Sequence, residues 1–371
     1  MAIQGMATQA ARVGVWKGEI LARAIPVEVL GLAGTIKSIP KNASDTVKYR
    51  RWVPYNAANT VPSTGVVGYN GLVPDRVTAE TEAGTNVVKT MLAAHETADA
   101  GATPSAETIV AQDITATLVQ YACLYSFTDK VVDLYEDDVS DALKTQVAER
   151  MALIRELELY SKVRAGTNRQ FAGGSTIGTV AAKITPSFLR KAARSLAKAH
   201  SKKITSILAP SANIGTKPIE AAYLVFCHSD IEADLRDETV FPTYTPVAAY
   251  GSRKPMHENE IGSFESFRFI VSPELVPFTN AGVAVGVTGF IASGATLVDV
   301  YPVLIVGQEA YGTVALRGSN SFDLSVIPVG NKDSADPLGQ RGYIGAKFYA
   351  CSVMLNQGWS VTGFVASGAL A

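Results

Sequence analysis

The sequence has few of the residues that build cross-linked or metal-bound sites. It contains 3 cysteines and 4 histidines in 371 residues. Cys123, Cys227 and Cys351 stand far apart in apolar runs, which is typical of small buried hydrophobic residues rather than of disulfide partners or metal ligands. This pattern favours a reducing compartment.

Motifs for catalysis are also missing. No glycine is followed by Lys-Ser or Lys-Thr at the spacing of a phosphate-binding loop, and no G-x-S-x-G nucleophile turn occurs. His95 and His257 each precede a glutamate, but neither is followed by a histidine at the zinc-helix position. The sequence therefore predicts no catalytic residue, no cofactor and no metal site. A site assembled from distant residues stays open.

Signals for membranes are weak. Residues 1–23 lack the apolar core of a signal peptide. Residues 275–298 carry no charge and are long enough to cross a bilayer, but Pro277 and four glycines interrupt them. We interpret this stretch as buried strands and turns and predict no membrane segment.

Charge is scarce and unevenly placed. Charged residues make up 18 % of the chain, below the usual share of about 25 %. This fits either a protein that buries much surface against copies of itself or a β-rich fold with many turns. The net charge is −1, which gives no global argument for nucleic-acid binding.

One stretch is nevertheless strongly basic. Residues 159–219 contain eleven lysines and arginines and no acid, whereas acids crowd residues 129–141 and 230–238. Three interpretations stay open: contact with nucleic-acid phosphates, contact with the acidic stretches of a neighbouring copy, or a solvated helix face. We predict inter-subunit contacts at Arg190, Arg194 and Lys198.

Two consecutive elements are longer than a compact domain needs. Residues 109–127 read as one β run of about 60 Å. Residues 139–164 predict one helix of about 40 Å. Its apolar stripe has helical spacing and consists of Leu143, Val147, Met151, Ile154 and Leu157. Such limbs indicate a subunit that reaches over its neighbours.

A long excursion precedes this β run. Residues 47–55 predict a strand, residues 56–106 are rich in Gly, Pro, Asn and Thr, and the β run then returns. Such a two-stranded arm has little core of its own and needs another surface. Arg50, Arg51 and Trp52 lie at its root and are predicted inter-subunit contacts, since Arg and Trp are favoured at interfaces. The alternative, that Trp52 is a core residue, stays open.

The rest of the chain mixes helices and strands, so the fold class is α+β. Thr185-Pro186 predicts the start of a second helix. Ser229 to Glu232 predicts a capping box and a short helix to about Arg236. The remaining predicted strands are residues 204–209, 222–227, 264–271, 295–306, 311–316 and 343–356.

Several segments resemble a known family. They are residues 114–121 leading into Thr128-Asp129, residues 259–262 before Phe267–Val271, residues 336–343, and Ala346-Lys347. Together with the order of the parts, they resemble the HK97-fold major capsid proteins of tailed bacteriophages, and most closely the N4-like major capsid protein family. The resemblance covers the chain from about residue 47 onward.

The resemblance implies a division of the chain. An N-terminal arm would span 1–46, and an extended β-hairpin called the E-loop would span 47–122. A peripheral domain with the long spine helix would span 123–184, with its return strands at 325–371. An axial domain would span 185–324.

The resemblance also implies a function. The chain would be a viral major capsid protein and not an enzyme, with hexamers and pentamers closing into an icosahedral shell around double-stranded DNA. Its partners would be other copies of itself, packaged DNA bound without sequence specificity, and scaffold, portal and decoration proteins. It would be found in the virion capsid after assembly in the host cytoplasm. The alternatives are an encapsulin-type compartment shell and a cytoplasmic α/β enzyme.

Overall fold

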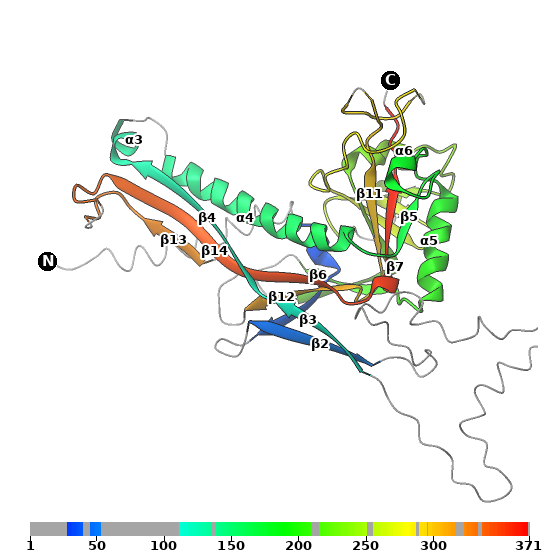
Figure 1. The fold of residues 1–371 in the computed structure, drawn as a ribbon, viewed down its shortest axis with the longest axis horizontal. Coiled ribbons are helices and arrows are strands. Elements are labelled where there is room, and N and C mark those ends of the chain that lie inside the picture. Colours follow the sequence, from blue (N-terminus) through cyan, green and yellow to red (C-terminus); the bar gives the residue numbers. More distant parts are fainter. Residues whose placement is uncertain are drawn as a thin grey trace, which may run out of the picture.

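A long limb and a broader domain share one long helix (Figure 1). The computed structural model describes residues 28–39, 45–52, 111–134, 139–209, 215–250, 255–286, 289–294, 296–316, 323–332 and 336–369. The predicted arm before residue 28 and the predicted excursion at 56–106 lie outside these residues. The domain boundaries given above stay a prediction.

The limb is built on a five-stranded sheet around one long strand, β14 (Arg341–Met354). Antiparallel to it run β4 (Val119–Thr128), β12 (Tyr311–Leu316) and β13 (Asp323–Ile327). The fifth strand, β1 (Thr35–Ile39), pairs in parallel with β12. The pairing of β4 with β14 extends over ten residues on each strand, so the limb is a long antiparallel ribbon.

Helix α4 (Val139–Arg164) lies along this ribbon (Figure 1). One face of the ribbon alternates toward the helix, so that Cys123 and Phe127 of β4 are buried while Leu124 between them is 67 % exposed. Val147 and Met151 of α4 complete this core together with Ile344 and neighbouring residues of β14. The short helix α3 (Asp129–Leu134), which precedes α4, buries none of its residues.

The domain is built on an eight-stranded sheet in the order β5-β15-β11-β7-β10-β9-β8, with β6 beside β7. Its strands are β5 (Arg169–Phe171), β6 (Ile204–Ala209), β7 (Gly215–Cys227), β8 (Thr245–Pro246), β9 (Glu260–Phe264), β10 (Phe267–Val271), β11 (Tyr301–Val306) and β15 (Ser360–Val365). Every residue of β11 and β15 is buried. A strand buried on both faces must be covered by other elements on each side.

Helices cover the two faces of this sheet. On one face lies α5 (Pro186–Lys198), where Thr185 caps the helix by accepting a hydrogen bond from the Phe188 N–H. Phe188, Leu189 and Leu196 point from α5 into the core against the sheet. On the other face lies the C-terminal part of α4, with Leu159, Tyr160 and Val163. Helix α4 therefore belongs to both cores.

A separate two-stranded sheet projects below the limb (Figure 1). It pairs β2 (Thr46–Trp52) with β3 (Ala111–Thr117) in antiparallel register. Its core is small, with Tyr49 and Ala116 packed on Val314 of β12. The remaining elements are α6 (Glu232–Leu235) and the 3₁₀ turns Leu30–Leu32, Ile177–Thr179, Ser229–Ile231, Val247–Ala249 and Gln357–Trp359.

Many predicted elements are confirmed. The long helix, the strands at 204–209 and 311–316, and the Thr185-Pro186 start agree with the structure. The predicted strands at 47–55, 222–227 and 343–356 correspond to β2, β7 and β14 with shifted ends. Cys123 and Cys227 are buried and all three cysteines are free.

Three local predictions were wrong. The long β run is broken at Leu118, because β3 pairs with β2 and β4 pairs with β14, so the chain changes partner there. The predicted strand at 264–271 is a hairpin that turns at Glu265, whose φ is 50°. In place of the predicted Ser229 box, His228 caps the 3₁₀ turn Ser229–Ile231 by accepting a hydrogen bond from the Asp230 N–H, and α6 follows this turn with no side-chain cap of its own.

Two further predicted segments have a different arrangement in the structure. Residues 325–371 divide between the two sheets, since β14 lies in the limb and β15 lies in the domain. The strand expected at 295–306 begins only at Tyr301, and the described residues between 275 and 298 form turns with isolated bridges. Among the described residues, no helix combines the length and apolar character needed to span a membrane.

Candidate assembly surfaces

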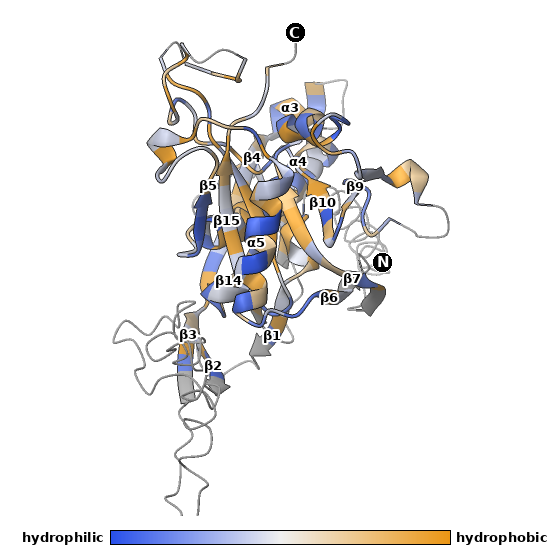
Figure 2. Cartoon of the chain, turned by 90° about the vertical axis from the view of Figure 1, so that its right-hand side faces the viewer, coloured by the Kyte–Doolittle hydropathy of each residue, from blue (hydrophilic) through white to orange (hydrophobic). Residues whose placement is uncertain are grey.

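The basic stretch forms an exposed face on α5. Arg190, Lys191, Arg194 and Lys198 are all exposed there, and Lys202 and Lys203 follow in the next turn. Figure 2 shows this helix with its hydrophilic side turned outward. Lys191, Arg194 and Lys198 recur at i, i+3 and i+7, which places them on one side of the helix.

The predicted residues on this face differ in their partners. Arg190 is already engaged, with its Nη2 2.6 Å from Oε1 of Glu265. This hydrogen bond and charge raise the pKa of Arg190 above its usual value. Arg194 and Lys198 form no ion pair within the described part of the chain. The same is true of Lys191, which was not among the predicted contact residues. These three cations are therefore the part of the face that is open to a partner.

The second predicted surface lies at β2. Arg50 pairs across the strands with Asp113 of β3, through Nε to Oδ1 at 2.8 Å and Nη2 to Oδ2 at 3.0 Å. The Arg50 guanidinium lowers the pKa of Asp113. Arg51 and Trp52 continue the strand opposite Gln112 and Ala111, but their side chains lie outside the described residues. The structure thus gives Arg50 a role within the subunit, in holding β2 to β3.

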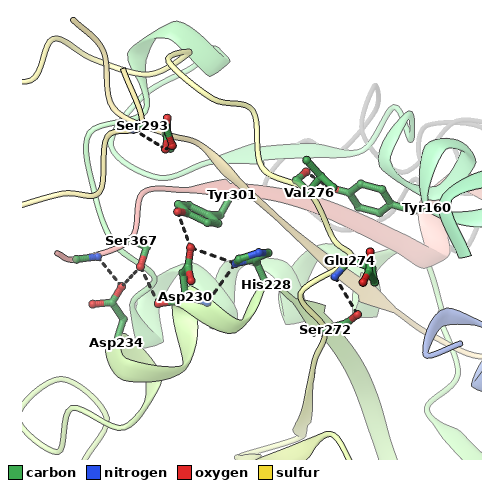
Figure 3. Close-up of polar contacts among 12 residues, drawn as sticks. Tyr160, His228, Asp230, Asp234, Ser272, Glu274, Val276, Ser293, Tyr301 and Ser367 are labelled. Atoms are coloured by element: carbon green, nitrogen blue, oxygen red, sulfur yellow. Dashed lines mark hydrogen bonds and ion pairs between the residues drawn. The ribbon is translucent and has the colours of Figure 1, made fainter. Parts of the chain in front are cut away.

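A polar network fixes the end of the chain to the domain (Figure 3). Asp234 of α6 accepts hydrogen bonds from the Gly368 N–H at 2.9 Å and the Ser367 hydroxyl at 3.2 Å. Lys183 lies 3.0 Å from the other oxygen of this carboxylate. The same Ser367 hydroxyl also donates to the Asp230 carbonyl. The segment after β15 is therefore tied to α6 by two independent donors.

The same network reaches the tip of the domain. The Tyr301 hydroxyl donates to Oδ2 of Asp230 at 2.8 Å, and burial raises the pKa of Tyr301. Nearby, Asp299 accepts from the Asn280 N–H at 2.7 Å and from the Ser293 N–H at 2.8 Å. These carboxylates organise the loops that surround the last residues of the chain.

This arrangement holds the loops of the domain together. His228 Nδ1 accepts from the Asp230 backbone N–H at 3.2 Å and also lies 3.2 Å from Oδ2 of the same aspartate. The described residues contain no group of three or more His, Cys, Asp or Glu side chains placed to hold a metal ion. A cavity of about 290 Å³ beside β6, β7 and β10 is lined by both signs of charge, including Lys203, Glu220 and Glu265.

Buried charged groups on α4 and in the domain were not predicted from the sequence. Glu156 lies within α4, 2 % exposed, and its carboxylate contacts the turn at Val29 and Leu30. Arg268 lies in β10, where its Nε is 2.7 Å from Oε1 of Glu260. The available signals were a glutamate at a helical spacing of four between Ala152 and Tyr160, and an arginine inside the apolar run Phe267–Val271.

Comparison with known proteins agrees with this picture. Residues 161–321 match the model of a family described as phage capsid protein. The major capsid protein of Pseudomonas phage KPP21 is 25 % identical over 167 residues. That match spans 42 % of this chain and 42 % of the length of that relative.

Solved capsids share the fold over nearly the whole chain. A capsid chain of Ralstonia phage GP4 has a TM-score of 0.56 at 10 % identity and covers 91 % of each chain. A capsid chain of cyanophage Pam1 has a TM-score of 0.55 at 14 % identity and covers 94 % of this chain and 93 % of its own. One from cyanophage P-SCSP1u has a TM-score of 0.52 at 12 % identity, over 93 % and 90 %.

These relatives are shell components rather than enzymes, in agreement with the sequence prediction. The N4-like subfamily stays a prediction. In fold and in sequence the chain is similar to the major capsid proteins of tailed bacteriophages, and its α+β architecture is their HK97-like capsid fold.

Proposed function

We propose that this chain is the major capsid protein of a tailed bacteriophage and that many copies form an icosahedral shell. The observation that carries the proposal is the extent of the shared fold, which spans 91–94 % of the chain in three phage capsids. A match over this share of the chain includes the limb, helix α4 and the domain. The matched sequence family and the curated relative are phage capsid proteins as well, which favours a phage shell over an encapsulin compartment.

The limb supports this proposal because it exposes large apolar side chains that its own core does not cover. Leu124 on β4, Leu134 on α3 and Leu338 between β13 and β14 are 67 %, 71 % and 72 % exposed. Contacts with further copies would remove this surface from water, at roughly 25 cal/mol per Å² of apolar area. A shell gains its stability from many such modest contacts.

The basic face of α5 fits contact with a neighbouring copy. Arg194 and Lys198 carry no ion pair within the described part of the subunit, and acidic side chains such as Asp237 and Glu238 are exposed on another part of the same domain. In a ring of copies, one side of each domain would meet a different side of the next. Complementary charge on two such sides would fix their register.

The finer parts of the proposal are hexamers and pentamers as building blocks, packaged double-stranded DNA bound without sequence specificity, and scaffold, portal and decoration proteins as partners. Assembly in the host cytoplasm belongs to the same proposal. Arg50, Arg51 and Trp52 are retained as proposed inter-subunit contacts, with Arg50 reaching a neighbour only on the side that Asp113 leaves open.

The direct test is to express the chain alone and examine the soluble fraction by negative-stain microscopy and light scattering. Closed particles or ring-shaped capsomers would support the proposal. If the chain stays small alone, co-expression with the scaffold protein of its own phage is the second arm. A small discrete oligomer in both arms would contradict the proposal.

A charge-reversal pair tests the role of α5. Arg194→Glu with Lys198→Glu should reduce particle yield at least about tenfold while leaving the subunit folded, since both side chains are exposed. The control restores complementary charge on the acidic side, by adding Asp237→Lys with Glu238→Lys to the same chain, and should recover the particle yield. A yield that stays low in the fourfold variant would refute the contact with this acidic side, and circular dichroism of each subunit would check its fold.

A further inference from the structure

The segment that follows β15 crosses the tip of the domain between α6 and an exposed loop. We call residues 366–369 the strap and residues 289–294 the tip loop. Ala366, Ser367 and Gly368 of the strap are buried. In Figure 1 the strap is at the top of the domain, next to the mark for the end of the chain. The strap therefore runs through the interior, although the tip loop beside it lies at the surface.

Hydrogen bonds hold the strap on α6 (Figure 3). The Gly368 N–H donates to Oδ2 of Asp234 at 2.9 Å, and the Ser367 hydroxyl lies 3.2 Å from the same oxygen. That hydroxyl also lies 2.8 Å from the Asp230 carbonyl oxygen. Asp234 is 8 % exposed, and Nζ of Lys183 lies 3.0 Å from its Oδ1. The attachment is strong, because hydrogen bonds to an ionised group are about twice as strong as neutral ones.

The backbone of the strap approaches this carboxylate closely. A methyl group added at Gly368 would lie 2.8 Å from Oδ1 of Asp234 and closer still to the end of the Lys183 side chain. This separation is shorter than an ordinary van der Waals contact. Glycine at this position thus lets the strap lie directly on Asp234, with no side chain between them.

On its other side, the strap holds the tip loop through backbone hydrogen bonds. The Ile291 N–H donates to the Ser367 carbonyl at 2.9 Å, and the Ala369 N–H donates to the Gly289 carbonyl at 2.9 Å. The two segments form an isolated antiparallel bridge there. The residue whose hydroxyl faces α6 therefore also offers its carbonyl to the tip loop.

The tip loop has little core of its own. None of residues 289–294 is buried, and Phe290 packs partly on the apolar cluster that contains Ala366 of the strap. Away from the strap, Asp299 accepts from the Ser293 N–H at 2.8 Å and donates its own N–H to the Ile291 carbonyl at 3.0 Å. An exposed loop of this kind depends on the hydrogen bonds at its edges for a defined conformation.

We propose that the strap couples α6 to the tip loop and that Asp234 is a positioning residue for this loop. A strap seated on Asp234 presents the Ser367 carbonyl and the Ala369 N–H to the loop, whereas a released strap leaves the loop with its hydrogen bonds to Asp299. Within the described part of the chain, the Asp234 side chain accepts hydrogen bonds from the strap and none from the tip loop. The inference goes beyond the proposed function, because it concerns how one subunit positions an exposed loop.

Amide hydrogen exchange on the unassembled full chain measures this coupling. Mass spectrometry with fragmentation that resolves single amides would follow Ile291, which donates to the strap, and Ser293, which donates to Asp299. Asp234→Ala leaves the Gly368 N–H without its acceptor, so the opening constant of the Ile291 amide should rise about ten- to a hundredfold. The rise at Ser293 should be smaller, and the amides of β11 should keep the wild-type rate.

Two further variants complete the test. Asp237→Ala is the matched control, because this exposed aspartate of the same segment accepts from the Thr239 N–H at 3.0 Å instead of from the strap. It should leave the exchange of the tip loop unchanged. Ser367→Ala removes a single hydroxyl from the attachment, and it should raise the opening constant of the Ile291 amide about two- to tenfold.

An Ile291 amide that keeps its wild-type protection in Asp234→Ala while the Gly368 amide loses its own would overturn the proposal, because the strap would then move without the loop. If Asp234→Ala also raises exchange throughout β11, Ser367→Ala decides, and unchanged protection of Ile291 in that variant would overturn the proposal as well. None of these results depends on whether the chain forms shells. Failure of the coupling can thus be told apart from failure of the proposed function.

Discussion

The buried ion pair between Arg268 and Glu260 gives a sharp test of what holds the domain together. The two side chains are 8 % and 0 % exposed. Glu260 accepts from Arg268 Nε at 2.7 Å and Nη2 at 3.1 Å, from the Tyr250 hydroxyl at 2.9 Å and from the Met256 N–H at 2.6 Å. One carboxylate therefore holds Tyr250 and Met256 as well as the arginine.

Arg268→Met should lower the free energy of unfolding by about 3–5 kcal/mol, because it leaves a buried carboxylate without its counter-charge. Glu260→Gln should have a similar cost, because it leaves the guanidinium unpaired. The double variant buries no charge, and the amide oxygen introduced by Glu260→Gln can still accept from one of the two loop donors. Its cost should fall below the sum of the two single costs by at least about 2 kcal/mol.

Urea unfolding of the unassembled subunit, followed by circular dichroism, would measure these values. Arg190→Met is the matched control, since it breaks an Arg–Glu pair whose side chains are 62 % and 39 % exposed and should change stability little. Costs that add within about 0.5 kcal/mol in the double variant would refute the reasoning. A cost below about 1 kcal/mol for Arg268→Met would do the same.

Two further predictions concern the core beneath the limb and the excursion. Met151→Ala on α4 should lower the free energy of unfolding by about 2–5 kcal/mol in urea denaturation, because Met151 is 1 % exposed between the helix and the ribbon. A change no larger than that of an exposed alanine substitution would contradict the assigned core. Deleting residues 56–106, which lie outside the described part, should leave soluble subunits or capsomers that do not close, as seen by negative-stain microscopy. Normal shells from the deletion would rule out that this excursion is needed for closure.

Sequence patterns predicted the elements whose signals are local. The helical spacing of Val147 and Met151 was enough for α4, and Thr185-Pro186 was enough for the start of α5. The break at Leu118 had no such signal, because the residues on both sides have similar β propensity. What changes there is the pairing partner, and a pairing partner is a long-range property.

Exposure of the basic residues on α5 also has a local signal, whereas their predicted inter-subunit contacts stay a prediction. A run of basic residues on a helix predicts an exposed face, and Arg190, Arg194 and Lys198 are all exposed. The sequence did not reveal that Glu265, in the hairpin between β9 and β10, takes up Arg190. Pairing across 75 residues depends on the fold. The unpaired face is consequently narrower than the predicted one and includes Lys191.

Glu156 is a residue whose helical spacing indicated a buried position but whose hydrogen-bond partners could not be predicted from the helix alone. It occupies a position four residues after Ala152 and four before Tyr160, both of them buried, so the apolar stripe passes through it. Within α4 alone, a buried carboxylate at this position would be destabilising. The burial of this carboxylate is explained by Val29 and Leu30, 127 and 126 residues away, because their N–H groups donate to it.

Glu156 also ties the turn at Val29 and Leu30 to the middle of the subunit. Helix α4 packs on the limb through Val147 and Met151 and on the domain through Leu159 and Val163, and Glu156 lies between these two contacts. The turn that it holds continues into β1, which pairs with β12 in the limb sheet. Loss of these hydrogen bonds would therefore act where limb and domain meet. It would loosen the turn that positions β1 on the edge of the limb sheet, rather than the interior of either core.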